Sequence, residues 1–249
     1  MIASLPMYAR PVNRAAHDLL WELIRDGLRR HGIAAPDRLD HDINYFKSWG
    51  RPDLVLGQIC NLPYRAVFHD SVTRIGAADH NLPGCPPGYY NSVIVMHQDR
   101  EPTGATLLRF ACNDLLSQSG HVAMRDWAAE NGVTLKPPII TGSHHQSVAA
   151  IANGTADIAS IDANTWIMEC ADGTAATQCR EIGRSAPSPG MTFITRSGED
   201  PAPYFKAISA AIHALPGEAR VTLNLRGIVA LPDAAYGAPV PDDMQTAPA

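Results

Sequence analysis

The sequence predicts an α/β protein whose two lobes are joined by a hinge of two chain crossings, with a ligand cleft between the lobes. Short apolar strands alternate with amphipathic helices along most of the chain, a pattern typical of α/β folds. Residues 84–88 and 187–190 are rich in Pro and Gly, and they enclose a block with a strand–helix series of its own. Two lobes joined by a hinge form a cleft that can close on a ligand. A single continuous sheet with a long loop at residues 82–90 is the alternative.

The segments before the first Pro/Gly-rich stretch alternate as β-α-β-α-β, which predicts a parallel sheet with right-handed crossovers. The long helix begins at Pro11, has apolar residues at helical spacing and ends before Gly32. Gly50 and Pro52 then break the chain before the second strand. The predicted strands are 2–7, 53–57 and 72–77, and the predicted helices are 11–31 and 61–68.

The enclosed block opens with a long β-type run and continues as strands alternating with helices that stop at Gly132 and Gly154. The pattern resumes after the second breaker, and the proline-rich tail from residue 232 is predicted to be irregular. The predicted strands are 89–97, 107–111, 135–140, 157–161, 178–182, 191–195 and 228–231; the helices are 119–131, 144–153, 163–170, 203–215 and 217–225; a loop is predicted at 98–104. These elements predict one discontinuous lobe, residues 1–86 with 188–249, and one inserted lobe, residues 87–187.

The composition excludes several classes of protein. With 20 basic and 25 acidic side chains in 249 residues, the net charge is −5, which argues against a nucleic-acid partner. The apolar runs are far too short to cross a bilayer. The content of 45% hydrophobic and 18% charged residues is ordinary for a folded chain, and a chain of this length needs no metal or disulfide for stability.

The cysteines indicate no metal or cofactor site, and the N-terminus does not fix the cellular compartment. Five cysteines occur without a CxxC or a zinc-type Cys/His spacing, so no metal and no cofactor are predicted. Buried free thiols are the simple interpretation, although Cys170 and Cys179 could pair in an oxidising compartment. The N-terminus lacks a basic n-region and a long apolar h-region, which predicts a cytoplasmic protein or one whose signal has been removed.

The strongest local motif is the polar segment that follows the strand at 107–111. Ser117 and Ser119 supply two hydroxyl groups at a predicted helix start, where free backbone N–H groups and the helix dipole favour anions. Gln118 lies between them, and Gly120 would allow a ligand to approach the backbone closely. These residues predict an oxyanion site made without a cation. A plain serine N-cap is the alternative.

Four further residues follow predicted strands, so each would lie at the edge of a sheet where the carboxyl ends of the strands meet. His144 starts a helix and could donate to an anion, or it could be an ordinary surface histidine. Asp162 could accept hydrogen bonds from a ligand, orient the histidine, or simply cap its helix. Tyr8 and Gln58 follow the first two strands and would come from the other lobe. Ligands of open α/β sheets bind outside the carboxyl ends of the strands, so we predict that these residues contact the ligand.

Catalytic motifs are absent from the sequence. It contains no GxSxG, HExxH, Walker A or GxGxxG pattern. Cys60 and Cys112 lie near strand ends, but neither has an obvious base nearby in the sequence.

Three segments resemble the phosphate, phosphite and phosphonate solute-binding proteins of ABC importers, which have the type II periplasmic binding fold. The segments are LLSQSG, TGSHHQSVAAIANGTADIASIDANTW and SAPSPG. In that family a Ser-Thr-Ser-Gly turn grips the phosphorus oxyanion, and here Gln118 stands in place of the usual Thr. The resemblance implies ligand contacts from Ser117, Gln118, Ser119 and Gly120, from Gly142, His144 and Ser147, from Asp157 and Asp162, and from Tyr8.

Two functions remain open at this point. The first is a monomeric solute-binding protein that closes on phosphate, phosphite or a phosphonate, serves an ABC permease and is periplasmic, as the resemblance implies. The second is a cytoplasmic enzyme of cofactor biosynthesis on the same fold, in which His144 acts as a general acid or base. A regulatory sensor module is a lesser alternative.

Overall fold

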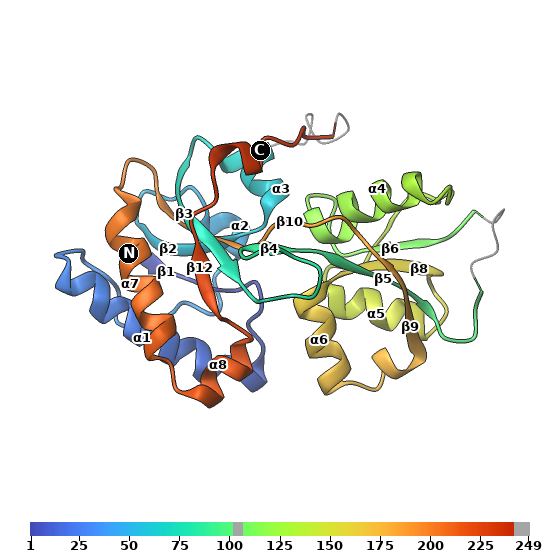
Figure 1. Cartoon of the computed structure of the whole chain (residues 1–249), viewed down its shortest axis with the longest axis horizontal. Helices are drawn as coiled ribbons and strands as arrows, with labels where there is room; N and C mark the ends of the chain where they lie inside the picture. The colour runs from blue at the N-terminus through green and yellow to red at the C-terminus, as the bar shows by residue number, and fades with distance from the viewer. Residues whose placement is uncertain (102–106, 242–249) are drawn as a thin grey trace. The chain divides into compact units, whose positions relative to one another are not determined.

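The computed structural model describes residues 1–101 and 107–241 (Figure 1). Within them the chain forms two units, each with its own five-stranded sheet. Unit 1 consists of Met1–Tyr89 and Pro189–Val240, and unit 2 consists of Tyr90–Ser188. The chain passes from one unit to the other in β4 (Tyr89–Tyr90) and returns in β10 (Ser188–Pro189), and these two short strands pair with each other. The predicted α/β class with two lobes is confirmed.

Unit 1 has the sheet order β1-β2-β11-β3-β12. Its elements are β1 (Ile2–Ala3), η1 (Pro11–Asn13), α1 (Arg14–Arg30), α2 (Tyr45–Ser48), β2 (Leu54–Ile59), α3 (Asn61–Pro63), η2 (Tyr64–Phe68), β3 (Val72–Asp79), β11 (Thr192–Arg196), α7 (Pro201–Ala214), α8 (Gly217–Leu223), β12 (Gly227–Val229) and η5 (Asp233–Tyr236).

The sheet of unit 1 is mixed, so the prediction of a parallel sheet is wrong in part. β1 and β2 pair in parallel, as predicted. However, β11 lies between β2 and β3 and is antiparallel to both, and β12 is antiparallel to β3. The β-α-β alternation of the first 80 residues indicates helical connections between strands. It cannot show that a strand from a distant part of the chain inserts between two of these strands.

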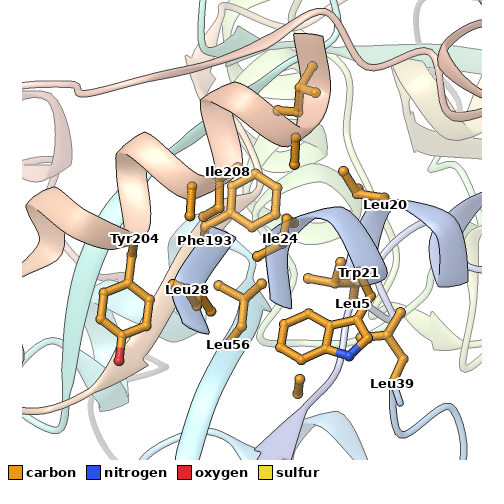
Figure 2. Close-up of a cluster of buried hydrophobic side chains, with 14 of the residues drawn as sticks. Leu5, Leu20, Trp21, Ile24, Leu28, Leu39, Leu56, Phe193, Tyr204 and Ile208 are labelled. Atoms are coloured by element: carbon orange, nitrogen blue, oxygen red, sulfur yellow. The ribbon is translucent and has the colours of Figure 1, made fainter. Parts of the chain in front are cut away.

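Two helices from opposite ends of the chain form the core of unit 1 with one face of the sheet. Helix α1 packs beside α7, and Phe193 of β11 and Leu56 of β2 lie in the same buried cluster (Figure 2). A Cβ on Gly27 would lie 3.0 Å from Ala207 Cβ, so the glycine lets the two helices approach closely. The periodic apolar face predicted for residues 11–31 therefore becomes the buried face of α1.

Unit 2 has the sheet order β7-β6-β8-β5-β9. The strands β6, β7 and β8 pair in parallel, whereas β5 runs antiparallel to β8 and β9. Its elements are β5 (Ser92–His97), β6 (Phe110–Cys112), η3 (Gln118–Val122), α4 (Ala123–Glu130), β7 (Ile139–Ile140), α5 (His144–Ala152), β8 (Ile158–Asp162), α6 (Ala163–Asp172), η4 (Ala176–Gln178) and β9 (Cys179–Arg184).

Several predicted elements differ from the observed ones for local reasons. The first strand ends at Ala3, and Pro6, which lacks an N–H, cannot donate to a ladder. The predicted run 89–97 is divided at Asn91 into β4 and β5. Of the predicted strand 135–140 only β7 forms, while Leu135 makes an isolated bridge to Leu108. The short helix α2 was not predicted.

The start of the C-terminal tail is more ordered than predicted. Tyr236 is buried, its hydroxyl lies 2.9 Å from Thr192 Oγ1, and Arg74 stacks over its ring. The predicted loop 98–104 and the predicted irregular tail extend into residues 102–106 and 242–249, outside the described residues. Among the residues described, no helix combines the length and apolar character needed to cross a bilayer.

Candidate oxyanion site

The turn after β6 is built on Ser117. This residue has extended backbone angles and caps the π-helical turn η3, which continues directly into α4. Its Oγ accepts a hydrogen bond of 2.9 Å from the backbone N–H of Gly120. The backbone N–H groups of His121 and Val122 donate to the Ser117 carbonyl. The N-cap of this helix is therefore Ser117, and the helix begins at Gln118, one residue before the predicted position.

Gly120 has a role different from the predicted one. An added Cβ would lie 1.7 Å from Asn113 Oδ1 and 2.9 Å from Asn113 Cγ. The space beside this glycine is thus filled by the Asn113 side chain, which the sequence reasoning missed. Asn113 Oδ1 is buried and has no hydrogen-bond partner among the described residues. Gly120 allows Asn113, rather than a ligand, to approach the backbone closely.

Ser119 connects this turn to the next helix of unit 2. Its Oγ lies 2.8 Å from Nε2 of His144, the first residue of α5. The same Oγ is 3.4 Å from Ser117 Oγ. The Ser119 carbonyl accepts a 2.6 Å hydrogen bond from the Ser160 hydroxyl of β8. The structure therefore brings together three of the predicted residues, Ser117, Ser119 and His144, and anchors them to the sheet.

His144 is held as a neutral imidazole at neutral pH. Burial lowers the pKa of its ring to about 4. Its Nδ1 is buried and has no hydrogen-bond partner within the described part of the chain. Residues 111–121 contain no Lys or Arg, and His121 of that segment has its Nδ1 2.9 Å from the Leu115 carbonyl. No Lys or Arg within this segment therefore supplies a positive charge to the turn, and the His144 ring is neutral.

The two aspartates of β8 lie at opposite ends of the strand. Asp162 is buried and caps α6, since its Oδ1 accepts a hydrogen bond from the Thr165 N–H. Asp157 precedes the strand and pairs with Arg109 and Arg100, and hydrogen bonds from Arg109 hold the pKa of its carboxyl at about 2. The ligand contact that the resemblance implies for Asp157 stays a prediction; the structure shows this carboxylate paired with arginines at the end of β8 opposite to Asp162.

The remaining predicted residues are buried. Gln118 is the first residue of η3. Gln58 and Tyr8 belong to unit 1, where Gln58 is part of β2 and its carbonyl accepts a hydrogen bond from Trp49 Nε1. The Tyr8 ring meets the His80 ring edge-on, with centroids 4.9 Å apart. His80, which directly follows β3, was not among the predicted residues.

The other motif expectations concern cysteine and metal chemistry. All five cysteines are free, so Cys170 and Cys179 are not paired in this structure. Burial raises the pKa of the Cys112 thiol to about 12, which leaves it protonated and a poor nucleophile. Within residues 1–101 and 107–241, no group of three or more His, Cys, Asp or Glu side chains is arranged to hold a metal ion.

Comparison with known proteins identifies relatives at the level of family and fold. The sequence model of a family described as "ABC transporter, phosphonate, periplasmic substrate-binding protein" matches residues 56–236. No curated protein sequence matches the chain.

Solved structures share the fold at low sequence identity. PhnD1 from Prochlorococcus marinus in complex with methylphosphonate has a TM-score of 0.68 and 13% identity, over 95% of this chain and 94% of that one. XAC2383 from Xanthomonas citri bound to chloride has a TM-score of 0.67 and 14% identity, over 94% and 92%. A binding protein component of an ABC phosphonate transporter from Pseudomonas aeruginosa, PA3383, has a TM-score of 0.64 and 16% identity, over 94% and 82%. These likenesses confirm the predicted type II periplasmic-binding-protein fold.

Proposed function

The chain belongs to the family of periplasmic substrate-binding proteins of phosphonate ABC transporters, and from that premise we propose that it binds phosphate, phosphite or a small phosphonate through Ser117, Ser119 and His144. Membership carries a solute-binding role for an ABC importer, with a small-molecule ligand and a permease as partners. The identity of the ligand and the residues that bind it are the part we propose.

The contact between Ser119 and His144 carries this proposal. For Ser119 to donate its hydroxyl hydrogen to an anion, the imidazole must carry its proton on Nε2 and donate it to Ser119 Oγ. Nδ1 makes no hydrogen bond of ordinary geometry among the described residues, although the backbone of Ser160 is close enough to raise the pKa of the ring. Ser117 Oγ likewise already accepts from the Gly120 N–H. In this arrangement each of the two hydroxyl oxygens accepts one hydrogen bond. The two oxygens lie 3.4 Å apart, so one hydroxyl can donate to the other. Even then, the second hydroxyl keeps its hydrogen free to donate to a ligand.

The backbone supports the same conclusion. The first hydrogen bonds of η3 come from Gly120, His121 and Val122. The first N–H groups of a helix have no acceptor within that helix, and in η3 these include the N–H of Ser119. Two hydroxyls and a backbone N–H at a helix start can bind several oxygens of one tetrahedral anion. The helix dipole also favours negative charge at this position.

The choice among anions follows from the family and from the relative that binds methylphosphonate. A phosphorus oxyanion has several oxygens at one centre and therefore uses several donors at once. For the enzyme alternative, Cys112 is no candidate nucleophile, because burial raises the pKa of its thiol to about 12.

A thermal-shift screen tests the proposal. The ligands are phosphate, phosphite, methylphosphonate, aminoethylphosphonate and sulfate. A ligand at one hundred times its Kd adds about 2.7 kcal/mol to the free energy of unfolding. This corresponds to a rise in Tm of roughly 5–11 °C, at about 2–4 °C per kcal/mol. We expect such a rise for at least one of the three phosphorus oxyanions or the amino-substituted phosphonate, and an unchanged Tm with all of them would contradict the proposal.

A further inference from the structure

Ser160 places a hydroxyl group in the centre of the sheet of unit 2. Its strand β8 lies between β6 and β5, and Ser160 pairs with Ile94 of β5. Ser160 is 1% exposed, and Ile158, on the same face of the strand, belongs to an apolar cluster. A buried hydroxyl in such surroundings costs free energy unless it is hydrogen-bonded. The partner of this hydroxyl therefore indicates why a polar residue lies here.

The partner of the Ser160 hydroxyl is the backbone of the candidate site. Ser160 Oγ donates a 2.6 Å hydrogen bond to the carbonyl oxygen of Ser119, the second residue of η3. This carbonyl lies in the same rigid peptide plane as the Cα of Ser119, from which the Ser119 side chain extends. The hydrogen bond therefore restrains the backbone that carries the Ser119 hydroxyl.

The backbone of Ser160 also lies near His144, the partner of the Ser119 hydroxyl. Burial lowers the pKa of the His144 ring to about 4, and the nearby backbone of Ser160 opposes that shift. Nε2 of the same ring is 2.8 Å from Ser119 Oγ. One residue of the central strand thus adjoins both members of the pair formed by Ser119 and His144.

The turn that carries Ser119 has an uncommon geometry. η3 is π-helical, and π-helical turns are rare, short and frequent at functional sites. Two side-chain hydrogen bonds hold its first residues: Ser117 Oγ accepts from the Gly120 N–H, and the Ser160 hydroxyl donates to the Ser119 carbonyl. The first of these bonds is made within the turn, whereas the second ties the turn to the sheet. Removal of the Ser160 hydroxyl would therefore loosen Ser119 from the sheet.

We propose that Ser160 is a positioning residue of the solute site: its hydroxyl holds the Ser119 backbone, and through it the Ser119 hydroxyl, in the orientation that binds a phosphorus oxyanion. This inference rests on the proposed function, because Ser160 acts through Ser119 and does not itself contact the solute. A donor that is already oriented loses less conformational freedom on binding than a donor that the ligand must order. The Ser160 hydroxyl therefore raises the affinity for the solute.

Ser160→Ala removes the hydroxyl and keeps Cβ. We expect this variant to bind methylphosphonate about 2- to 12-fold more weakly than wild type, the range for ordering one side chain at an interface. Ser48→Ala is the matched control, because Ser48 of unit 1 is also 1% exposed and its hydroxyl donates to the Tyr45 carbonyl at 2.7 Å. Both variants should have a lower Tm than wild type, whereas only Ser160→Ala should bind more weakly.

The experiment is calorimetric titration of methylphosphonate into wild type, Ser48→Ala, Ser160→Ala, Ser119→Ala and the double variant of Ser119 and Ser160, with the Tm of each free protein. Because Ser160 acts through the Ser119 hydroxyl, Ser160→Ala should weaken binding less than about 2-fold when residue 119 is already Ala. A purely structural role would not produce this coupling. Should Ser160→Ala fail to fold, Ser160→Cys replaces it in both backgrounds, since a thiol has a similar size and is only a weak donor.

Three results would overturn the inference: an unchanged Kd for Ser160→Ala, an equal loss of affinity in both backgrounds, or an equal loss for Ser48→Ala. If Ser119→Ala weakens binding and Ser160→Ala does not, the inference fails and the proposed function stands. If wild type binds neither methylphosphonate nor phosphate nor phosphite, both fail.

Discussion

The Oγ of Ser119 lies 2.8 Å from Nε2 of His144, which joins the turn after β6 to the first residue of α5, 25 positions later in the chain. When the ring donates a hydrogen bond to Ser119 Oγ, the hydroxyl hydrogen of Ser119 stays free to donate to a ligand. Because burial lowers the pKa of the ring to about 4, His144 is a neutral imidazole at neutral pH and not a cation.

Ser117→Ala should reduce both stability and affinity. The substitution removes an N-cap, which costs about 1 kcal/mol of the free energy of unfolding. It also removes a hydroxyl donor to the anion. Ser143→Ala is the matched control, because Ser143 caps α5 in the same way by accepting from the Gln146 N–H. Urea unfolding should show similar losses for the two variants, whereas calorimetry should show weaker phosphonate binding for Ser117→Ala alone. Equal affinities would assign Ser117 to capping only.

Gly120→Ala should destabilise the turn, because its Cβ would collide with Asn113 Oδ1 at 1.7 Å. The Asn113 side chain would have to move, and overpacking of this kind typically costs about 1–3 kcal/mol. Gly217→Ala serves as control, since a Cβ there meets no atom within 4 Å. That change should be neutral or should stabilise by up to about 1 kcal/mol. The prediction fails if the two variants have the same free energy of unfolding.

Much of unit 2's site could be predicted from the sequence because its signals are local. Ser117, Ser119 and His144 each follow a strand and start a helix, and the positions of strand ends relative to a sheet edge are a general property of α/β folds. The contact between Ser119 and His144 could not be predicted, because it depends on the packing of α5 beside the turn. Asn113 was missed for the same reason: nothing local indicates that its side chain fills the space at Gly120.

The order of the strands in the sheet of unit 1 could not be predicted from the sequence. The strands β2 and β3 are present at the predicted places, but β11 separates them in the sheet. The residues of β11, Thr192–Arg196, have the pattern of an apolar strand, and this pattern does not indicate which strands β11 pairs with. Asp157 was assigned to the ligand by resemblance, and its pairing with Arg109, which comes from a distant part of the chain, could not be predicted from the sequence.

The stability of the protein should fall as the pH is lowered from 6.5 to 4. The pKa values of the His80 and His144 rings are about 4, against an ordinary 6.5. Between these values the unfolded chain binds more protons than the folded one, so the stabilisation is complete above pH 6.5 and is lost as the pH falls towards 4. Each ring should cost on the order of 2 kcal/mol between pH 7 and pH 5. Urea unfolding of His80→Asn at both pH values should show a smaller decrease than wild type; an equal decrease would show that His80 does not titrate in this way.

The five thiols should differ widely in reactivity. Burial raises the pKa of Cys112 to about 12 and that of Cys179 to about 11, whereas Cys170 is exposed. Brief treatment of the native protein with iodoacetamide, followed by peptide mass spectrometry, should find Cys170 modified and Cys112 unmodified. Cys112 should react only after unfolding. Rapid native modification of Cys112 would indicate an activated thiolate and would reopen the enzyme interpretation.

Calorimetric titration of a phosphorus oxyanion into Ser119→Ala tests the central claim most directly. Ser119 is not the N-cap of its helix, but its loss leaves Nε2 of the buried His144 ring without its partner, so the free energy of unfolding should fall by about 1–3 kcal/mol while the variant stays folded. The variant lacks a hydroxyl donor to a charged ligand, a bond worth roughly 1.5–3 kcal/mol, which corresponds to about a 10- to 150-fold increase in Kd. Ser143→Ala, measured in parallel, should keep the wild-type Kd. If Ser119→Ala binds the ligand as tightly as wild type does, the oxyanion is not held at Ser119 and His144.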